Sequence, residues 1–309
     1  MAYDARVRSI QDLPLDPPRM SRIPVISLVV AVKDGEANLP AILQAVAEAG
    51  DAAVEVIFCV AGEPPAALAA AGPGWRLVRC AAESLVPHLW RDGVLAATTD
   101  RVMLTNTQCL PTAAWIRRLA GIDLDRYVAV GGPIDNDPAP DPVRWAVFFL
   151  RYLRFAPPAA GEVDDVAADN AAYRRSEILR HPDLLGIGLW EPSFHERFLA
   201  AGLKMAIDPG LLLTYRGDDR PGRFMAHRFA HGREYGYARA KDAPRLRRLA
   251  LLAASPLVPL LLVARIIART RGRPAYRARL PAALPWLAAF SAAWGAGEAL
   301  GYLRAVIRR

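Results

Sequence analysis

The stretch VISLVVAVKDGEANLPAIL, residues 25–43, sets the fold class that we predict for this chain. It opens with an apolar, mostly β-branched run, Val25–Val32, which is typical of a strand buried on both faces of a parallel sheet. The residues Lys33–Glu36 have the composition of a turn, and a helix is expected over Leu39–Ala49. The order strand, turn, helix indicates an α/β fold in which helices flank a mostly parallel sheet.

The turn after this first strand is also the first candidate binding region. In doubly wound α/β sheets, ligands lie at the carboxyl ends of the strands. Asp34 and Glu36 offer acceptors to a ribose or base, and Lys33 offers a positive charge to a phosphate. A solvated turn without a ligand is the alternative.

Further apolar runs, separated by residues typical of turns, continue the α/β pattern along the chain. Strands are expected at three places before residue 105 and over Val128–Ile134, which contains Gly131 and Gly132. Missing side chains at these glycines would let a substrate approach the backbone. The three earlier strands are Val54–Val60, Trp75–Cys80 and Arg101–Leu104.

A second stretch, WEPSFHERFLAAG at residues 190–202, predicts a short helix with a carboxylate at its N-terminus. Phe194 and Phe198 are four residues apart, and Gly202 is a C-terminal stop. The helix dipole favours the carboxylate of Glu191, and the neighbouring Trp190 removes part of its hydration. Glu191 is therefore a candidate general base, and an ordinary N-terminal helix carboxylate is the alternative.

In blocks over residues 23–239, the chain resembles the family 2 glycosyltransferases. Besides the two stretches above, RVMLTNTQCLPTAAWI resembles the family's metal-binding block, and VGGPI and ADNAAYRRSEIL resemble its acceptor side. The resemblance implies the Rossmann-like GT-A fold and an inverting transfer from a nucleotide-sugar donor, with Glu191 as the base. It also implies roles for further residues. The nucleotide would contact Arg91, Asn106 and Gln108, and the sugar or acceptor would contact Gly132, Asp169, Asn170 and Trp190.

Asn170 and Arg91 also have purely structural interpretations. Asn170 is also a residue type that is common in turns and helix caps. Arg91 is equally well explained as an arginine on the surface of a helix.

The chain departs from the family pattern where a metal is usually bound. Two acids normally hold Mn²⁺ or Mg²⁺ against the diphosphate, and here these positions are the neutral amides Asn106 and Gln108. The position of a common histidine ligand is Tyr215, and the aspartate that usually follows the second strand is absent. A divalent metal is therefore uncertain. Basic side chains would neutralise the diphosphate instead, and the candidates are Lys33, Arg91, Arg216, Arg223, Arg228 and Arg233, with His227 and His231 nearby. The alternative is a catalytically inactive GT-A-like module that binds or scaffolds within a membrane glycan-synthesis complex.

The composition limits the classes of partner that this protein is expected to bind. The formal net charge is +8, from 39 lysines and arginines against 31 acids, and this favours an anionic partner such as phospholipid or a nucleotide diphosphate. No zinc-ligand spacing or aromatic-interleaved basic module indicates nucleic acid. The three cysteines are an odd number, widely spaced in apolar runs, and are expected to be reduced core residues of a cytoplasmic protein. The acids and prolines of the N-terminus indicate no signal peptide.

The C-terminal region is the most hydrophobic part of the chain. We expect three parts: an N-terminal arm over residues 1–22, a GT-A domain over 23–240 and a helical hairpin over 241–309. Leu249–Ile267 and Leu280–Leu303 approach the length of a bilayer span, but prolines and charges interrupt them, and arginines flank both. We prefer a hairpin in the interface of the cytoplasmic leaflet, with two spans or a soluble hairpin as alternatives. The acceptor would be an envelope or lipid-linked glycan.

Overall fold

The computed structural model describes residues 24–33, 36–50, 52–69, 75–217 and 220–307. The expected N-terminal arm and Asp34 lie outside the described residues. The chain forms two compact units, of which the first is Met1–Asp135 with Phe155–Gly217 and the second is Asn136–Arg154 with Asp218–Arg309. We describe each unit by itself. The domain boundaries expected from composition stay a prediction.

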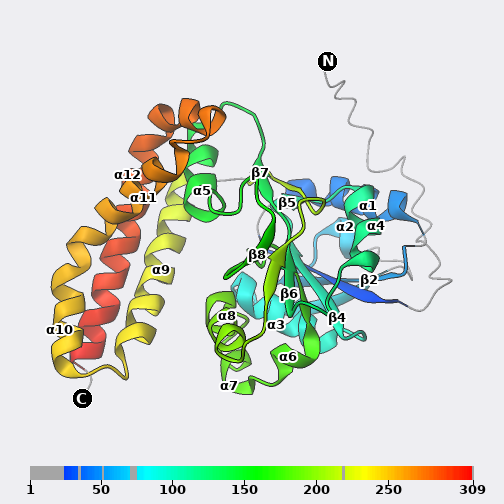
Figure 1. Cartoon of the computed structure of the whole chain (residues 1–309), viewed down its shortest axis with the longest axis horizontal. Helices are drawn as coiled ribbons and strands as arrows, with labels where there is room; N and C mark the ends of the chain where they lie inside the picture. The colour runs from blue at the N-terminus through cyan, green and yellow to red at the C-terminus, as the bar shows by residue number, and fades with distance from the viewer. Residues whose placement is uncertain (1–23, 34–35, 51, 70–74, 218–219, 308–309) are drawn as a thin grey trace. The chain divides into compact units, whose positions relative to one another are not determined.

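An eight-stranded sheet forms the centre of the first unit (Figure 1), in the order β3-β2-β1-β4-β9-β6-β10-β8. Its strands are β1 (Ile26–Val32), β2 (Val54–Ala61), β3 (Arg76–Cys80), β4 (Arg101–Asn106), β6 (Ala129–Gly131), β8 (Gly161–Val163), β9 (Asn170–Arg174) and β10 (Met205–Ile207). All seven residues of β1 are buried, as expected for a central strand with helices on both faces. The predicted first strand and first helix are confirmed.

The sheet is mixed, which corrects the expectation of a mostly parallel one. β1 pairs in parallel with β2 and β4, and β6 with β10, but β9 lies antiparallel between β4 and β6. The antiparallel pairing brings the start of β9 to the end of β4, where Thr105 pairs with Asn170. The segment over Gly161–Asp165, which has the composition of a loop, begins with β8, and β8 covers the edge of β10.

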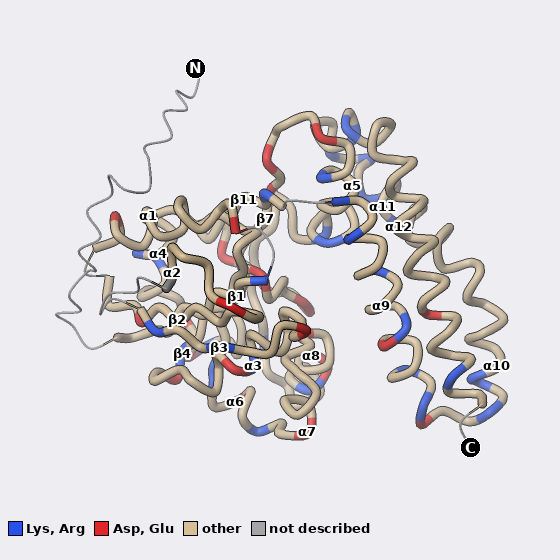
Figure 2. Tube along the Cα trace, turned by 180° about the vertical axis from the view of Figure 1, so that it is seen from behind, with Lys and Arg blue, Asp and Glu red and all other residues tan. Residues whose placement is uncertain are grey.

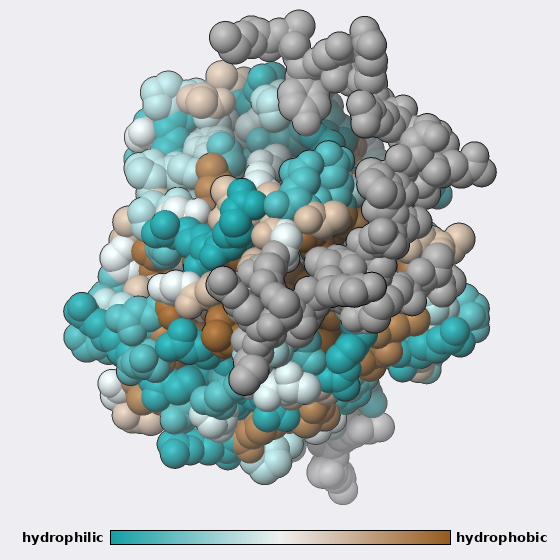
Figure 3. All heavy atoms as spheres, turned by 90° about the vertical axis from the view of Figure 1, so that its right-hand side faces the viewer, coloured by the Kyte–Doolittle hydropathy of each residue, from teal (hydrophilic) through white to brown (hydrophobic). Residues whose placement is uncertain are grey.

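Helices cover both faces of this sheet (Figure 1). α1 and α4 lie on one side, and α3, α6 and α8 lie on the other. The bounds are η2 (Glu36–Asn38), α1 (Leu39–Ala49), α2 (Ala66–Ala69), α3 (Val86–Ala96), α4 (Ala113–Arg118), η3 (Leu119–Gly121), α6 (Arg175–Leu179), α7 (Pro182–Leu185) and α8 (Glu191–Ala200). The face seen in Figure 3 is largely hydrophilic with scattered apolar residues, which is ordinary for a folded protein.

The strand expected over Val128–Ile134 is broken at Gly132 and Pro133. β6 ends at Gly131, and the chain continues as β7 (Ile134–Asn136) in a separate three-stranded sheet with β5 (Cys109–Leu110) and β11 (Leu213–Tyr215). A Cβ at Gly132 would lie 2.0 Å from the carbonyl oxygen of Leu211. The glycine therefore permits a close backbone approach here, and the proline, which lacks an N–H, ends the ladder.

The second unit is helical. Its elements are α5 (Pro142–Arg151), α9 (Pro221–Ala240), α10 (Arg245–Ala254), η4 (Ser255–Leu257), α11 (Val258–Thr270) and α12 (Pro274–Ile307). α12 packs against all the other helices of the unit. The aromatic residues of α5 are buried: Trp145 and Phe148 pack on Tyr276 of α12, with ring centroids 6.2 and 5.7 Å apart.

Glycines bring α9 and α12 unusually close. Gly232 and Gly236 are four residues apart on α9, and Gly297 and Gly301 have the same spacing on α12. A Cβ at any of these positions would lie 2.1 to 2.4 Å from a backbone oxygen of the facing helix. Small residues with this spacing let helix backbones touch, as in membrane helix pairs.

The outer surface of the second unit is apolar along α10 and α11. Leu246, Leu257 and Leu260 are 81, 56 and 68% exposed. Arg245–Thr270 is long and apolar enough to cross a membrane, and it is the one such helix in the described part of the chain. The second predicted segment, Leu280–Leu303, instead lies in α12, where Leu287 and Phe290 are fully buried in protein. Figure 2 shows lysines and arginines at both ends of these helices.

Candidate functional site

Polar side chains gather where β4 ends and β9 begins. The side-chain amide of Asn106 donates a hydrogen bond to Asp169, and its carbonyl oxygen accepts one from the backbone N–H of Gln108 at 2.8 Å. Asn106 and Asp169 are 3 and 7% exposed. The two predicted site residues are therefore in direct contact, and the topology explains why, since β9 enters the sheet beside β4 in the opposite direction.

Asn38 ties three loops together beside these residues. Its side-chain amide donates to the carbonyl oxygens of Thr107 and Arg216, both at 2.8 Å. The backbone N–H of Arg216 in turn donates to the carbonyl oxygen of Gln108 at 2.7 Å. The backbone of Arg216 is therefore held next to Gln108, and its exposed side chain extends from this position. Asn38 was not among the residues predicted to belong to the site.

Glu191 is the first residue of α8, as the sequence predicts. Burial raises the pKa of Tyr173 well above its ordinary value of 10.0, and the negative charge of Glu191 is the next largest cause, followed by Asp165 and Asp169. Such a charge effect falls off with distance, so all three carboxylates lie near Tyr173 on β9. The charges of Glu191 and of the two aspartates therefore act on the Tyr173 hydroxyl.

A buried hydrogen-bonded chain supports this group. His195 Nδ1 lies 2.7 Å from Asp165 Oδ1, and His195 Nε2 lies 3.0 Å from the Tyr173 hydroxyl. A carboxylate beside Nδ1 places the proton of a neutral imidazole on that nitrogen, so Nε2 accepts from Tyr173. His195 and Tyr173 are 3 and 1% exposed. The chain joins α8, β9 and the segment that precedes β9.

The sequence alone did not identify Asp165, His195 and Tyr173, the three members of this hydrogen-bonded group, as functional residues. The signal present in the sequence is that His195 lies four residues after Glu191, on the same face of α8. Asp165 lies in the acidic segment before β9, and Tyr173 lies four residues after Asp169. None of these spacings is specific by itself, because the contact between β9 and α8 depends on the tertiary fold.

Two predicted acceptor residues have structural contacts. Asn170 is fully buried, donates to the carbonyl oxygens of Pro133 and Leu211 at 3.0 and 2.6 Å, and accepts from Trp115 Nε1 at 3.2 Å. The backbone N–H of Gly132 donates to the carbonyl oxygen of Asn170 at 2.8 Å. These bonds join the two sheets, and a sugar-binding role for either residue stays a prediction.

The remaining candidates of the first unit lie after β1, on α3 and directly before α8. Lys33 donates to the carbonyl oxygen of Ser84 at 2.5 Å, and Glu36 is exposed at the start of η2. Arg91 Nε lies 2.7 Å from Asp92, so this arginine is held on α3. Trp190 Nε1 donates to the carbonyl oxygen of Ile187 at 3.0 Å, which fixes the ring beside Glu191.

The other predicted diphosphate contacts lie on α9 in the second unit. Arg228 stacks on Trp294, with the guanidinium carbon 4.2 Å from the ring centroid. Arg233 lies 3.0 Å from Glu234, and the rings of His227 and His231 are stacked 6.4 Å apart. Their expected role at the diphosphate stays a prediction.

The residues at the end of β4 do not fit a carboxylate metal site. Asn106 uses its amide and its carbonyl oxygen in hydrogen bonds, and an amide oxygen lacks the charge that attracts Mn²⁺. In the described ranges, no group of three or more His, Cys, Asp and Glu side chains is arranged to hold a metal ion. Tyr215, at the position of the family histidine, is fully buried.

Comparison with known proteins adds the class of the fold. The sequence matches no protein-family model and no curated protein. Among solved structures, it is similar to the mannosyltransferase PcManGT from Pyrobaculum calidifontis in complex with GDP-Man and Mn²⁺. The TM-score is 0.53 and the identity 16%, over 93% of this chain and 91% of that chain. The fold of this chain is therefore similar to that of the solved mannosyltransferase. At this identity, the likeness concerns the fold alone.

Proposed function

We propose that this protein is an inverting glycosyltransferase that takes a sugar from a nucleoside-diphosphate donor. The observation that supports the proposal is that Glu191 is the first residue of α8, the helix whose His195 contacts Asp165 and Tyr173. Asp169 contacts Asn106 at the end of β4, which is the edge of the sheet where α/β folds bind ligands. The likeness to a solved mannosyltransferase is consistent with this assignment.

The chemistry assigned to Glu191 is a single displacement. Its carboxylate removes the proton of an acceptor hydroxyl as that oxygen forms a bond to the anomeric carbon. The bond from this carbon to the diphosphate oxygen breaks, and the nucleoside diphosphate leaves with the electron pair. Attack from the face opposite the leaving group inverts the configuration. The proton ends on Glu191, and no covalent sugar intermediate forms.

The leaving diphosphate is stabilised by positive charge. The side chains of Asn106 and Gln108 are neutral amides, so they would hold a divalent cation only weakly and a metal would not supply this charge. We propose that basic side chains supply it, with Arg216 as the first candidate. The backbone of Arg216 is held beside Gln108 by the hydrogen bond between the two residues and by Asn38, so its exposed side chain starts close to the strand ends. Lys33 is the second candidate.

We further propose that the second unit lies on a membrane surface, with α10 and α11 in the plane of the membrane at the boundary between the lipid headgroups and the acyl chains. Leucines on these helices are exposed, and arginines lie at their ends. An in-plane position is favoured over a span, because α9 packs along α12 and exposes Glu234 and Arg239. A span by α10 and α11 would take α12, which packs on both, and α9 with it, so these charges would enter the bilayer. The proposed acceptor is a lipid-linked or envelope glycan at the cytoplasmic face.

A binding screen tests the assignment. Thermal shift and calorimetry against UDP, GDP and their sugar conjugates, with and without Mn²⁺, should give a midpoint increase for one donor that does not require the metal. An Arg216→Gln variant should weaken that binding, whereas Arg220→Gln, an exposed arginine on the same segment, serves as the matched control. Absence of binding to every nucleotide would favour the alternative of an inactive scaffolding module.

A further inference from the structure

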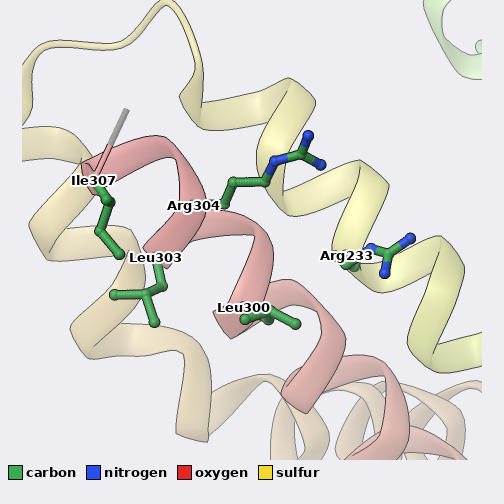
Figure 4. A pocket seen from close by; sticks show the side chains of 5 residues that line it. All are labelled: Arg233, Leu300, Leu303, Arg304 and Ile307. Carbon is green, nitrogen blue, oxygen red and sulfur yellow. The ribbon is translucent and has the colours of Figure 1, made fainter. Parts of the chain in front are cut away.

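The second unit contains a groove that combines an apolar wall with basic side chains. Its volume is about 410 Å³, within the range of small-molecule sites, and it lies along the last turns of α12. Figure 4 shows Leu300, Leu303 and Ile307 on α12, with Arg304 extending from the same helix toward α9, which carries Arg233. The three apolar side chains are 43, 40 and 69% exposed, so the wall is open to an incoming molecule.

The two arginines stay available at the surface. Arg304 lies over the ring of Tyr237, with its guanidinium carbon 4.7 Å from the ring centroid. Arg233 lies 3.0 Å from Glu234, and both side chains are about half exposed, so this pair holds the guanidinium weakly. Each guanidinium keeps further N–H donors that a phosphate can accept from.

The surroundings of the groove are basic. Arg239 donates to the Tyr302 hydroxyl at 3.2 Å, and Arg248 donates to the carbonyl oxygen of Ala305 at 2.7 Å. These contacts bring the end of α9 and the start of α10 to the end of α12. Lys241, Arg245 and Arg247 belong to the same region, where Glu234 and Asp242 are the exposed acids among the described residues.

We propose that this groove binds the headgroup and the upper acyl chain of one anionic phospholipid. The phosphate would lie between Arg233 and Arg304, and the chain would follow Leu300, Leu303 and Ile307. The apolar wall favours a lipid over free phosphate, because a hydrated ion gains nothing from leucine and isoleucine. α10, the first helix of the apolar surface, packs against α12, which carries the apolar wall of the groove. The inference rests on the proposed membrane association and names the lipid class.

The test compares two double variants that lose the same charge from the same end of the unit. Arg233→Gln with Arg304→Gln removes the proposed phosphate contacts, and Arg245→Gln with Arg247→Gln removes two exposed arginines at the start of α10. Flotation with phosphatidylcholine vesicles, with and without 30% phosphatidylglycerol, measures binding. The groove variant should lose at least tenfold more of the preference for anionic vesicles than the control. Equal loss in the two variants would overturn the proposal, because it would indicate surface charge alone.

A second measurement is independent of vesicles. Native mass spectrometry of the full chain in neutral detergent with phosphatidylglycerol should show one retained lipid in the wild type and the control, and none in the groove variant. A Leu303→Ser variant should also lose the lipid. Displacement of the lipid by millimolar inorganic phosphate would contradict the assignment to a lipid. If the lipid is retained in detergent but vesicles are not bound, the groove stands and the membrane association fails.

Discussion

The imidazole of His195 lies 2.7 Å from the carboxylate of Asp165, and this contact connects the helix that begins with Glu191 to the segment before β9. The second imidazole nitrogen contacts the Tyr173 hydroxyl, and the two rings are nearly parallel, with an interplanar angle of 19°. Because His195 and Tyr173 are buried, solvent cannot replace the contact between them. The arrangement fixes α8 relative to β9 and to the segment that precedes β9.

Replacing Tyr173 with phenylalanine tests this chain. The variant leaves Nε2 of His195 buried without its donor, and we expect a loss of about 1–3 kcal/mol in the free energy of unfolding. Urea denaturation measures it. Glu196→Gln, at an exposed position on α8, is the control and should change stability by less than about 0.5 kcal/mol. Equal stability of the Phe variant and the wild type would contradict the arrangement.

Glu55 predicts an acid limit of stability. Burial acts to raise its pKa, but hydrogen bonds from Ser27, Thr98 and Arg76 outweigh this and hold the pKa below its ordinary value of 4.5. The carboxylate therefore stabilises the fold above pH 4.5, and the contribution is lost as the pH falls through the folded pKa.

A Glu55→Gln variant should be less stable than the wild type at pH 7, by about 2 kcal/mol. The difference between the two proteins should shrink below pH 4.5, because the wild-type carboxyl then becomes neutral. Unfolding curves between pH 7 and pH 3 measure both quantities. A difference that is constant over this range would show that the charged form is not the stabilising one.

The contact between α9 and α12 predicts a strong distinction between two glycines of one helix. Gly236→Ala places a Cβ 2.4 Å from the carbonyl oxygen of Glu298, so the helices must separate. We expect a destabilisation of about 1–3 kcal/mol from overpacking. Gly222→Ala meets nothing within 4 Å and should be neutral or slightly stabilising, since alanine favours a helix. Thermal unfolding of the two variants separates these outcomes.

The amide of Asn106 predicts the result of restoring an acid. Asn106→Asp removes the donor to Asp169 and places two carboxylates in contact, so one should take up a proton or both should bind a cation. The variant should be less stable than the wild type without metal, and Mn²⁺ should raise its unfolding midpoint by several degrees more than that of the wild type. Equal responses to Mn²⁺ would show that this position has no part in metal binding.

Local sequence patterns were sufficient for the elements around the first strand. The buried run that forms β1 and the helix Leu39–Ala49 follow from residue periodicity, and Glu191 at the start of α8 follows from its spacing to Gly202. The break at Gly132 could not be read locally, because the obstacle is the carbonyl oxygen of Leu211, distant in sequence.

The contacts of the candidate site depend even more on topology. Asn106 meets Asp169 because β9 runs against β4, and this direction is not encoded in the composition of either strand. The association of α9 with α12 has the same origin, although the glycine spacing on both helices was a usable signal. The sequence identified Asp169 and Asn106 as candidates separately, and the fold makes them a pair.

The most direct test of the account is the turnover of a Glu191→Gln variant on the donor identified by the binding screen. The amide keeps the size of the side chain but cannot accept the proton of the acceptor hydroxyl. We predict that kcat falls at least a hundredfold, as expected for loss of a general base, while the nucleotide is bound within threefold of the wild-type affinity. Transfer at the wild-type rate by the Gln variant would contradict the assignment of Glu191 as the base.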